Sequence, residues 1–262
     1  MGLSYGPVAK VIVEDRGQVR VLRLNRPEVL NAIDGETAAM IEATIVGFAG
    51  DPAARVLVVT GDERSFSSGA DLKNVASLVQ RPGWQRTGPL GFARLDPGKP
   101  AIAAVEGHCF AGGLELALWC DFRIAGEGAE FGVLNRRWGI SLVDGGTQRL
   151  RSVLGVGNAL YLLETGARVD AAWALRNGLV QEVVARGGAL ERALELAEQV
   201  ASYPQASLLA DRKGLLRAAG LDIGLRLEAE LGYATLDDPE TSRLLEAFAR
   251  GDRPPSPRPP DG

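Results

Sequence analysis

The chain of 262 residues has very little imidazole and very little thiol. His108 is the only histidine. A metal site built from several histidines is therefore excluded, and a Ser-His-Asp triad could use only this residue. Cys109 and Cys120 are the two cysteines, and their spacing matches no metal-ligand motif. Any acid–base chemistry must therefore come mainly from carboxylates.

The sequence also lacks a surplus of positive charge and long apolar runs. A formal net charge of -4 without a basic run gives no electrostatic case for a nucleic-acid partner. No apolar run is long enough to span a membrane, and the opening MGLSYGPVAKV has no apolar segment typical of a secretory signal. Because both cysteines are expected to be reduced and buried, we expect a cytoplasmic protein.

A packed core is expected, because 46% of the residues are hydrophobic and 24% are charged. Alternation over 8–13 and 19–24, around the turn Asp15-Arg16-Gly17, predicts a hairpin. Asp34 is expected to cap a helix that runs to about Phe48. Further strands are expected at 55–60, 101–105, 122–125, 130–131 and 180–184, and further helices at 146–154, 157–165 and 170–177.

Strands and helices alternate through the first three quarters of the chain, and helical patterns alone follow. This order predicts an α/β core with an α-helical C-terminal subdomain. We place the core at 1–200, the helical subdomain at 201–252 and a Pro-rich tail at 253–262. Residues 80–98 hold several Gly and Pro with little periodicity, which is typical of a loop or a broken helix.

Two glycine-rich runs carry most of the functional signal. They are FSSGADL, residues 66–72, and FAGGLELALWCD, residues 110–121. Each places small residues where a backbone must approach something closely, and each leads into a helix-like stretch whose first N–H groups have no partner. Two such turns facing each other would aim a pair of N–H donors at one oxygen, which is an oxyanion hole. Glu115 follows the second turn closely, so a proton-transfer group lies nearby; a carboxylate that only stabilises the helix N-terminus is the alternative.

Several segments together resemble the crotonase, or enoyl-CoA hydratase/isomerase, superfamily. They are LNRPEVLNAI (24–33), FSSGADL, KPAIAAVEGHCFAGGLELALWCDFRIA (99–125), AEFG (129–132), DGGTQRL (144–150) and the segment 171–184. The resemblance covers nearly the whole chain. It implies an α/β fold, a crotonase-like spiral of ββα units, with an α-helical C-terminal subdomain for oligomerisation as a homotrimer or a dimer of trimers.

The resemblance further implies an acyl-CoA thioester as substrate, no separate cofactor and a place in fatty acid metabolism. The oxyanion N–H groups would be those of Ala70 and Gly112. Residues expected along the coenzyme A path are Arg26, Leu30, Ala32, Ala70, Asp71, Leu72, Lys73 and, for the nucleotide phosphates, Arg212 or Lys213.

The chain departs from the family pattern at one position. Family hydratases use two glutamates; the first falls on Glu115 and the second on Asn135. Asparagine cannot gain or lose a proton at neutral pH, and losing one general acid or base typically costs about 10²–10⁴ in rate. Asn135 either binds substrate or water, or satisfies its own loop.

Asp144 is the candidate replacement acid or base. It precedes Gly145-Gly146-Thr147, so a helix N-cap is its default interpretation. Dienoyl-CoA isomerases of the family carry a working aspartate in a similar context, one residue away in register. His108 is expected to be structural. The residues Arg136, Arg137 and Trp138 either line the acyl end of the pocket or form a solvated face.

Three functions remain open at this point. The first is hydration or double-bond migration of an enoyl-CoA, with Glu115 as acid/base. The second keeps the thioester but performs isomerase, hydrolase or decarboxylase chemistry with Asp144. The third is an acyl-CoA-binding protein with little catalysis, because the second glutamate is replaced by Asn135.

Overall fold

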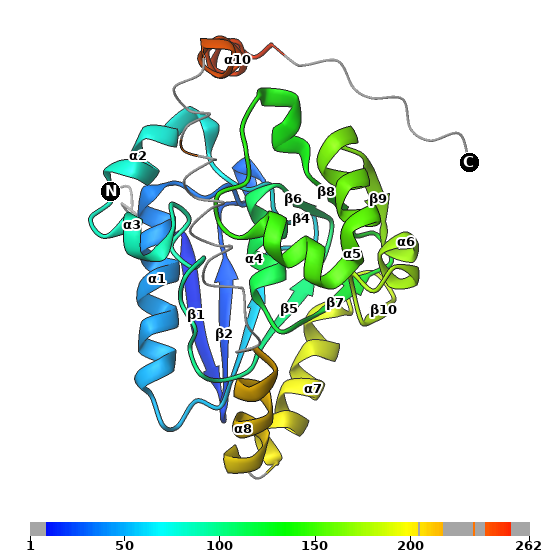
Figure 1. The fold of residues 1–262 in the computed structure, drawn as a ribbon. Coiled ribbons are helices and arrows are strands. Elements are labelled where there is room, and N and C mark those ends of the chain that lie inside the picture. Colours follow the sequence, from blue (N-terminus) through cyan, green and yellow to red (C-terminus); the bar gives the residue numbers. More distant parts are fainter. Residues whose placement is uncertain (1–8, 204, 217–232, 234–238, 253–262) are drawn as a thin grey trace, which may run out of the picture.

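Two β-sheets and the helices around them make up the protein, whose computed structural model describes residues 9–203, 205–216, 233 and 239–252 (Figure 1). The Pro-rich tail predicted for 253–262 lies outside the described residues. The predicted domain boundary at 200/201 falls inside α7 (Ala189–Ser202), close to its C-terminal end.

The larger sheet has the strand order β1-β2-β3-β5-β7-β10. Its strands are β1 (Val11–Arg16), β2 (Val19–Leu24), β3 (Val56–Thr60), β5 (Ala101–Val105), β7 (Phe122–Gly126) and β10 (Glu182–Val184). The predicted hairpin is confirmed as the antiparallel pair β1–β2, and all other pairings are parallel. Its turn is at Gly17 and Gln18, not at 15–17, because Asp15 and Arg16 still pair with β2.

Alternating side chains of the larger sheet enter two separate cores. Leu57 and Val59 of β3 pack with α1 (Gly35–Gly50) on one face, whereas Val56 and Val58 pack with α7 on the other. The helix α7 presents an alanine at every fourth position, which are Ala189, Ala193, Ala197 and Ala201. Small side chains at this spacing let one helix face lie close against the sheet.

The smaller sheet has the order β4-β6-β8-β9 and lies next to the C-terminal ends of the larger sheet's strands. Its strands are β4 (Ser65–Ser67), β6 (His108–Phe110), β8 (Glu130–Gly132) and β9 (Arg168–Asp170). β4, β6 and β8 each follow directly on a strand of the larger sheet, and helix α4 (Gly112–Trp119) follows β6. The expected α/β fold of successive ββα units is therefore confirmed.

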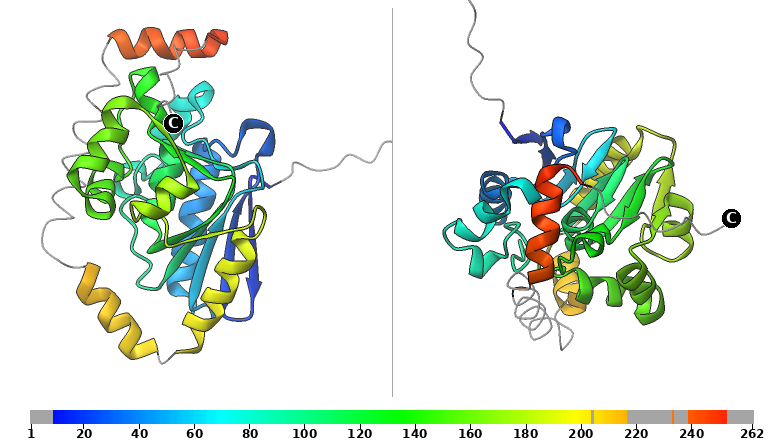
Figure 2. Two further views of the ribbon diagram at one scale, coloured as in Figure 1. Left: turned by 90° about the vertical axis from the view of Figure 1, so that its right-hand side faces the viewer. Right: turned by 90° about the horizontal axis from the view of Figure 1, so that it is seen from above.

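The remaining helical elements surround these sheets. They are η1 (Pro27–Val29), η2 (Leu72–Asn74), α2 (Val75–Gln80), α3 (Trp84–Thr87), η3 (Leu134–Trp138), α5 (Gly146–Thr165), α6 (Ala171–Arg176), α8 (Gln205–Leu216) and α10 (Pro239–Arg250). The two helices expected at 146–154 and 157–165 are confirmed as the two halves of α5, which is interrupted at Gly155, where φ is 70° and ψ is 172°. Helix α10 crosses one end of the molecule, against η2 and η3, while α7 and α8 lie at the other end (Figure 2).

Candidate active site

A cavity of about 740 Å³ lies between the two glycine turns, η2, η3 and α10. Both predicted oxyanion residues and all three predicted catalytic residues border it. These residues are Ala70, Gly112, Glu115, Asn135 and Asp144. The fold thus brings together residues that are up to 74 positions apart in the chain.

The two glycine turns are in direct backbone contact. Gly69, which follows β4, has φ of 94°, and a Cβ atom there would lie 2.7 Å from the backbone nitrogen of Gly112. A Cβ on Gly112 would in turn lie 3.4 Å from the nitrogen of Ala70. Glycine is therefore required at Gly69, both for its dihedral angles and for the close approach of the second turn.

The N–H groups of Ala70 and Gly112 have no acceptor among the described residues. Backbone bonds flank Ala70 on both sides: Ile33 N–H donates to Gly69 O, and Asp71 N–H donates to Ile33 O, each at 2.8 Å. Gly112 is the first residue of α4, where a helix leaves its N–H unpaired. Two neighbouring N–H groups that border a cavity can together bind one negatively charged oxygen.

The turn before Gly112 is held in an unusual conformation. Ala111 has φ of 50° and ψ of -122°, a combination that residues with a side chain rarely adopt. It is fixed by its N–H, which donates to Gly132 O at 2.9 Å, and by its carbonyl, which accepts from Glu115 N–H at 3.0 Å. Such strain often accompanies functional sites, because the surrounding structure must maintain it.

Glu115 projects from the first turn of α4 and is only 3% exposed. Its Oε1 accepts hydrogen bonds from the backbone N–H groups of Asp144 and Gly146, each at 2.9 Å. Because Gly146 begins α5, the carboxyl group also lies at the positive end of that helix dipole. These contacts orient the carboxyl group beside the cavity.

Asp144 is fully buried and borders the cavity, and its Oδ1 accepts from the backbone N–H of Leu90 at 3.2 Å. The N-cap interpretation of its side chain is wrong. The N-cap of α5 is Gly145, at φ of 97°, and Asp144 lies one position before it. The carboxyl group instead links the segment before α5 to the 88–94 loop, while the backbone N–H of Asp144 contacts Glu115.

Asn135 is 8% exposed and lies in η3. Its Nδ2 donates to Ile140 O at 2.8 Å. The amide nitrogen therefore stabilises the loop that contains Asn135, which was one of the two roles expected for this residue. Its Oδ1 is buried and has no hydrogen-bond partner in the described part of the chain. This oxygen can accept a hydrogen bond from a ligand or water in the cavity.

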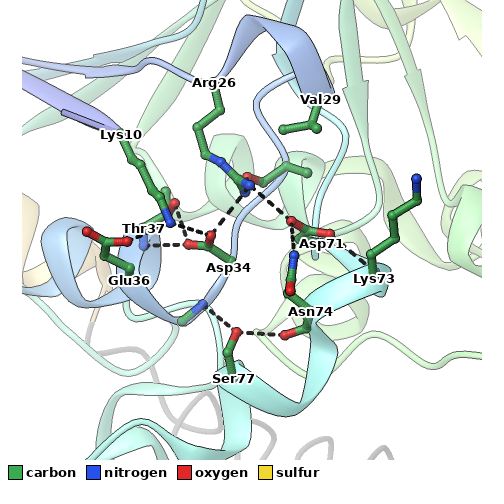
Figure 3. Close-up of polar contacts among 12 residues, drawn as sticks. Lys10, Arg26, Val29, Asp34, Glu36, Thr37, Asp71, Lys73, Asn74 and Ser77 are labelled. Atoms are coloured by element: carbon green, nitrogen blue, oxygen red, sulfur yellow. Dashed lines mark hydrogen bonds and ion pairs between the residues drawn. The ribbon is translucent and has the colours of Figure 1, made fainter. Parts of the chain in front are cut away.

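Most of the residues expected along the coenzyme A path border the cavity. They are Leu30, Ala32, Ala70, Asp71, Leu72 and Lys73. Arg26 does not: its guanidinium donates to Ala32 O at 2.6 Å and to Asp71 at 3.1 Å, and lies 3.4 Å from Asp34 (Figure 3). Arg26 therefore supports the walls of the cavity from behind.

Arg212 and Lys213 lie on α8, far from α10 and the cavity that it borders (Figure 1). The guanidinium of Arg212 binds Asp121 through two hydrogen bonds of 2.8 and 2.9 Å and contacts Asp96 at 3.2 Å. In a single chain neither residue reaches a ligand in this cavity. Their contact with nucleotide phosphates stays a prediction, which requires a second copy of the chain.

His108 is not among the residues that line the cavity. Its ring stacks on Phe110 at 5.1 Å between centroids, and Nδ1 lies 3.2 Å from Glu130. These contacts support the structural interpretation.

Other lining residues carry no sequence signal. Leu90, Leu142, Tyr233 and Phe248 come from the 80–98 loop, the approach to α5 and the C-terminal region. Burial raises the pKa of the Tyr233 hydroxyl, so the phenol stays protonated near neutral pH. These side chains match no motif, and only the fold shows that they meet.

The three residues after Asn135 were expected either to line the cavity or to form a solvated face, and both occur. Arg137 and Trp138 line the cavity, whereas Arg136 is exposed outside it. Within the described ranges, no three His, Cys, Asp or Glu side chains gather as a metal site requires. No helix in the same ranges has the length and apolar character needed to cross a membrane.

Comparisons with known proteins find relatives that match most of the chain. The family described as "Enoyl-CoA hydratase/isomerase" matches residues 14–248. A probable enoyl-CoA hydratase of Rhizobium meliloti is 37% identical over 241 residues, 91% of this chain and 94% of the relative. The 2,3-dehydroadipyl-CoA hydratase of Escherichia coli is 35% identical over 227 residues, 86% and 89% of the two chains. A solved carnitinyl-CoA hydratase of Mycobacterium avium superposes with a TM-score of 0.85 at 31% identity, covering 94% of this chain and 97% of its own.

Proposed function

This chain belongs to the enoyl-CoA hydratase/isomerase family and is an acyl-CoA enzyme of the hydratase type, and we propose that Ala70 and Gly112 form its oxyanion hole. The observation that carries the proposal is the contact between the two turns. Both N–H groups border one cavity, lie on adjoining backbone and lack an acceptor among the described residues. A thioester oxygen placed between them would accept both hydrogen bonds.

The reaction would use this charge stabilisation directly. In hydration, water oxygen bonds to the β-carbon, and the electrons of the double bond move toward the thioester oxygen as an enolate. Glu115 accepts the proton that the attacking water loses, and Asp144 in its protonated form gives a proton to the α-carbon. Transfer of the proton from Glu115 back to Asp144 then restores both groups, so that one water is added overall. Because negative charge develops on the thioester oxygen, the two N–H donors are expected to supply a large part of the rate acceleration.

The second proton-transfer group is Asp144 in this proposal. Asn135 cannot exchange a proton but can position water through its buried Oδ1. Asp144 lies fully buried at the cavity, and its backbone N–H binds the same Glu115 oxygen as that of Gly146. Two carboxyl groups beside one cavity also suit double-bond migration, in which one group removes a proton and the other returns it at a different carbon.

The coenzyme would lie along the residues from Leu30 to Ala32 and from Ala70 to Lys73. Lys73 is the cation on this side of the cavity, while its neighbour Asp71 is occupied by Arg26. The relatives are named for different acyl groups, so the family alone does not give the acyl chain. We also propose a homotrimer or a dimer of trimers, acting in the cytoplasm in fatty acid metabolism; exposed apolar side chains on α5 and α6 support the assembly.

Turnover of a series of trans-2-enoyl-CoA substrates by the wild-type enzyme and Glu115→Gln tests the proposal. We expect the Glu115→Gln variant to lower kcat by about 10²–10⁴ with little change in KM. Mass spectrometry of the products distinguishes hydration, which adds one water, from isomerisation, which leaves the mass unchanged. If the wild-type enzyme and the variant turn over a substrate at the same rate, Glu115 is not the catalytic group. If neither turns over any substrate, the protein binds acyl-CoA without catalysis.

A further inference from the structure

The acidic residues that line the cavity mostly have hydrogen-bond or ion-pair partners, whereas two of the basic residues have few. Among the acidic ones, Asp71 binds Arg26, Asp252 lies 3.4 Å from Arg250, and Glu115 and Asp144 accept backbone N–H donors. Glu28 is exposed at the rim. Among the described residues, the cations that line the cavity are Lys73, Arg137 and Arg168. Of these, Arg137 and Arg168 share one region with Phe110, Trp138 and Phe248.

Arg137 has no carboxylate partner within the described residues. Its polar contact within the described residues is a long hydrogen bond of 3.3 Å, which Nη2 donates to Gly166 O. Its Nε is buried and donates to no acceptor in the described chain. A guanidinium carries five N–H donors, so most of its capacity is unused by the protein. A partly buried cation in this state is costly unless an anion binds to it.

Arg168 brings a second positive charge to the same region. Phe110, Gly132 and Arg168 occupy equivalent positions on the neighbouring strands β6, β8 and β9. Because Gly132 has no side chain, the guanidinium of Arg168 extends across it to lie 5.0 Å from the centre of the Phe110 ring. Its ion pair with Glu130 is long, at 3.8 Å, and Glu130 also faces His108.

The two arginines repel each other. Burial, and then the nearby charge of Arg168, lower the pKa of the Arg137 guanidinium, although it remains protonated at neutral pH. Trp138 packs edge-on against Phe248 at 4.7 Å, so apolar rings border the same region and reduce screening by water. An anion between the two guanidinium groups would remove the repulsion.

We propose that Arg137 and Arg168 form a subsite that binds an anionic oxygen group carried by the thioester ligand. This inference rests on the proposed function, because the ligand must be an acyl-CoA. The group is a phosphate of coenzyme A or a carboxylate on the acyl chain. Each of these groups presents a pair of oxygens that a guanidinium can bind with two hydrogen bonds.

Four saturated thioesters, which the enzyme cannot hydrate, distinguish these two sources. They are hexanoyl-pantetheine, which carries no anion; hexanoyl-CoA, which adds phosphates; adipyl-pantetheine, which adds a carboxylate; and adipyl-CoA, which has both. Dissociation constants are measured by calorimetry for the wild-type enzyme, Arg137→Leu and Arg168→Leu. Arg136→Leu is the matched control, because Arg136 is the exposed neighbour outside the cavity.

We expect Arg137→Leu to weaken binding at least about tenfold, but only for ligands that carry the recognised anion. A loss confined to the CoA esters identifies the phosphates, and a loss confined to the adipyl esters identifies the acyl carboxylate. An equal loss for all four ligands, or none for any, would overturn the subsite. The dissociation constants are also measured at several salt concentrations. We expect the dissociation constant to depend less on salt in Arg137→Leu than in the wild-type enzyme, and equally on salt in Arg136→Leu. If the wild-type enzyme binds none of the four, the proposed function fails instead.

Discussion

At the residue scale, backbone N–H groups hold the carboxyl groups of Glu115 and Asp144 beside the cavity. Glu115 accepts from Asp144 and Gly146, and Asp144 accepts from Leu90. These bonds fix both carboxyl groups beside the cavity, where a group that transfers protons must lie within reach of the substrate.

Replacing Asp144 by Asn tests its part in proton transfer. The amide oxygen can still accept from Leu90 N–H, so the 88–94 loop is expected to keep its position. We expect kcat to fall at least about tenfold, because an amide cannot exchange protons. Steady-state kinetics and a melting curve check this. A normal rate in a normally folded variant would assign Asp144 a purely structural role.

Asp34 gives a prediction about the dependence of stability on pH. Burial acts to raise the pKa of this carboxyl group, but hydrogen bonds from Lys10 and Thr37 outweigh it and lower the pKa from 3.8 to about 2. A lowered pKa stabilises the fold above the unfolded value of 3.8, and this contribution is lost as the pH falls toward 2. Its size is on the order of 2 kcal/mol.

The variant Asp34→Asn keeps a helix cap but removes this titration. We therefore expect the wild-type protein to unfold at a higher denaturant concentration than the variant at pH 6. The difference should shrink steadily between pH 4 and pH 2. A difference that is independent of pH would show that the charge of Asp34 contributes nothing to stability.

The role of a side chain was predictable from the sequence where its partner lies a few positions away, and was not predictable where its partner is distant in the chain. The cap of α1 by Asp34 was predictable, because an N-cap bonds to a residue three positions away. The same local rule gave the wrong role for Asp144, whose partner Leu90 is 54 positions away. Arg26 was expected in the cavity, but its partners Asp71 and Asp34 come together only in the folded chain.

At the scale of elements, α4 is the element that positions Gly112 and Glu115. Its first turn lies against β4 so closely that a Cβ atom at Gly113 would overlap the carbonyl group of Ser67. At its other end, the buried Arg123 donates to the carbonyl oxygens of Ala117 and Cys120, at 3.4 and 3.1 Å. Both ends of the helix are thus fixed to the core.

The substitution Gly113→Ala is expected to shift the start of α4, because backbone at Ser67 cannot move aside easily. We predict a loss of about 1–3 kcal/mol in the free energy of unfolding, together with lower activity. Gly47→Ala is the matched control: it lies in α1 with open space around its Cβ and should be neutral or stabilising by up to about 1 kcal/mol. Equal behaviour of the two variants in chemical denaturation and turnover would contradict the close packing of α4.

Element types were predictable wherever the pattern was strong, as in the alternating 19–24 segment and the buried 101–105 segment, now β2 and β5. The position of α10 was not, because an amphipathic pattern gives a helix but not the surface that it covers. Its contacts with η2 and η3 depend on residues that match no motif, such as Phe248.

At the scale of the whole molecule, α5 and α6 carry a group of exposed apolar side chains. Val156, Leu160, Tyr161 and Leu175 are exposed by 36–54%. A cluster of this kind is more typical of an interface than scattered single residues are. The cluster is consistent with the proposed assembly of several copies.

We predict that the wild-type protein elutes as a trimer or hexamer and that Leu160→Glu shifts it toward the monomer. Val46→Glu, an exposed residue on α1 that is outside this cluster, should leave the assembly unchanged. Size-exclusion chromatography with light scattering measures both. A wild-type monomer at micromolar concentration would contradict the assembly.

The most direct test of the oxyanion hole is the infrared carbonyl frequency of a bound thioester labelled with ¹³C at the carbonyl carbon. Gly112→Pro removes one N–H donor at a position where a helix tolerates proline, and Gly112→Ala adds a Cβ, near the mobile end of the Leu90 side chain, but keeps the donor. We predict a lowered frequency in the wild-type enzyme and in Gly112→Ala, and a clearly smaller shift in Gly112→Pro. A wild-type frequency equal to that of the free thioester in water would contradict two N–H groups binding its oxygen.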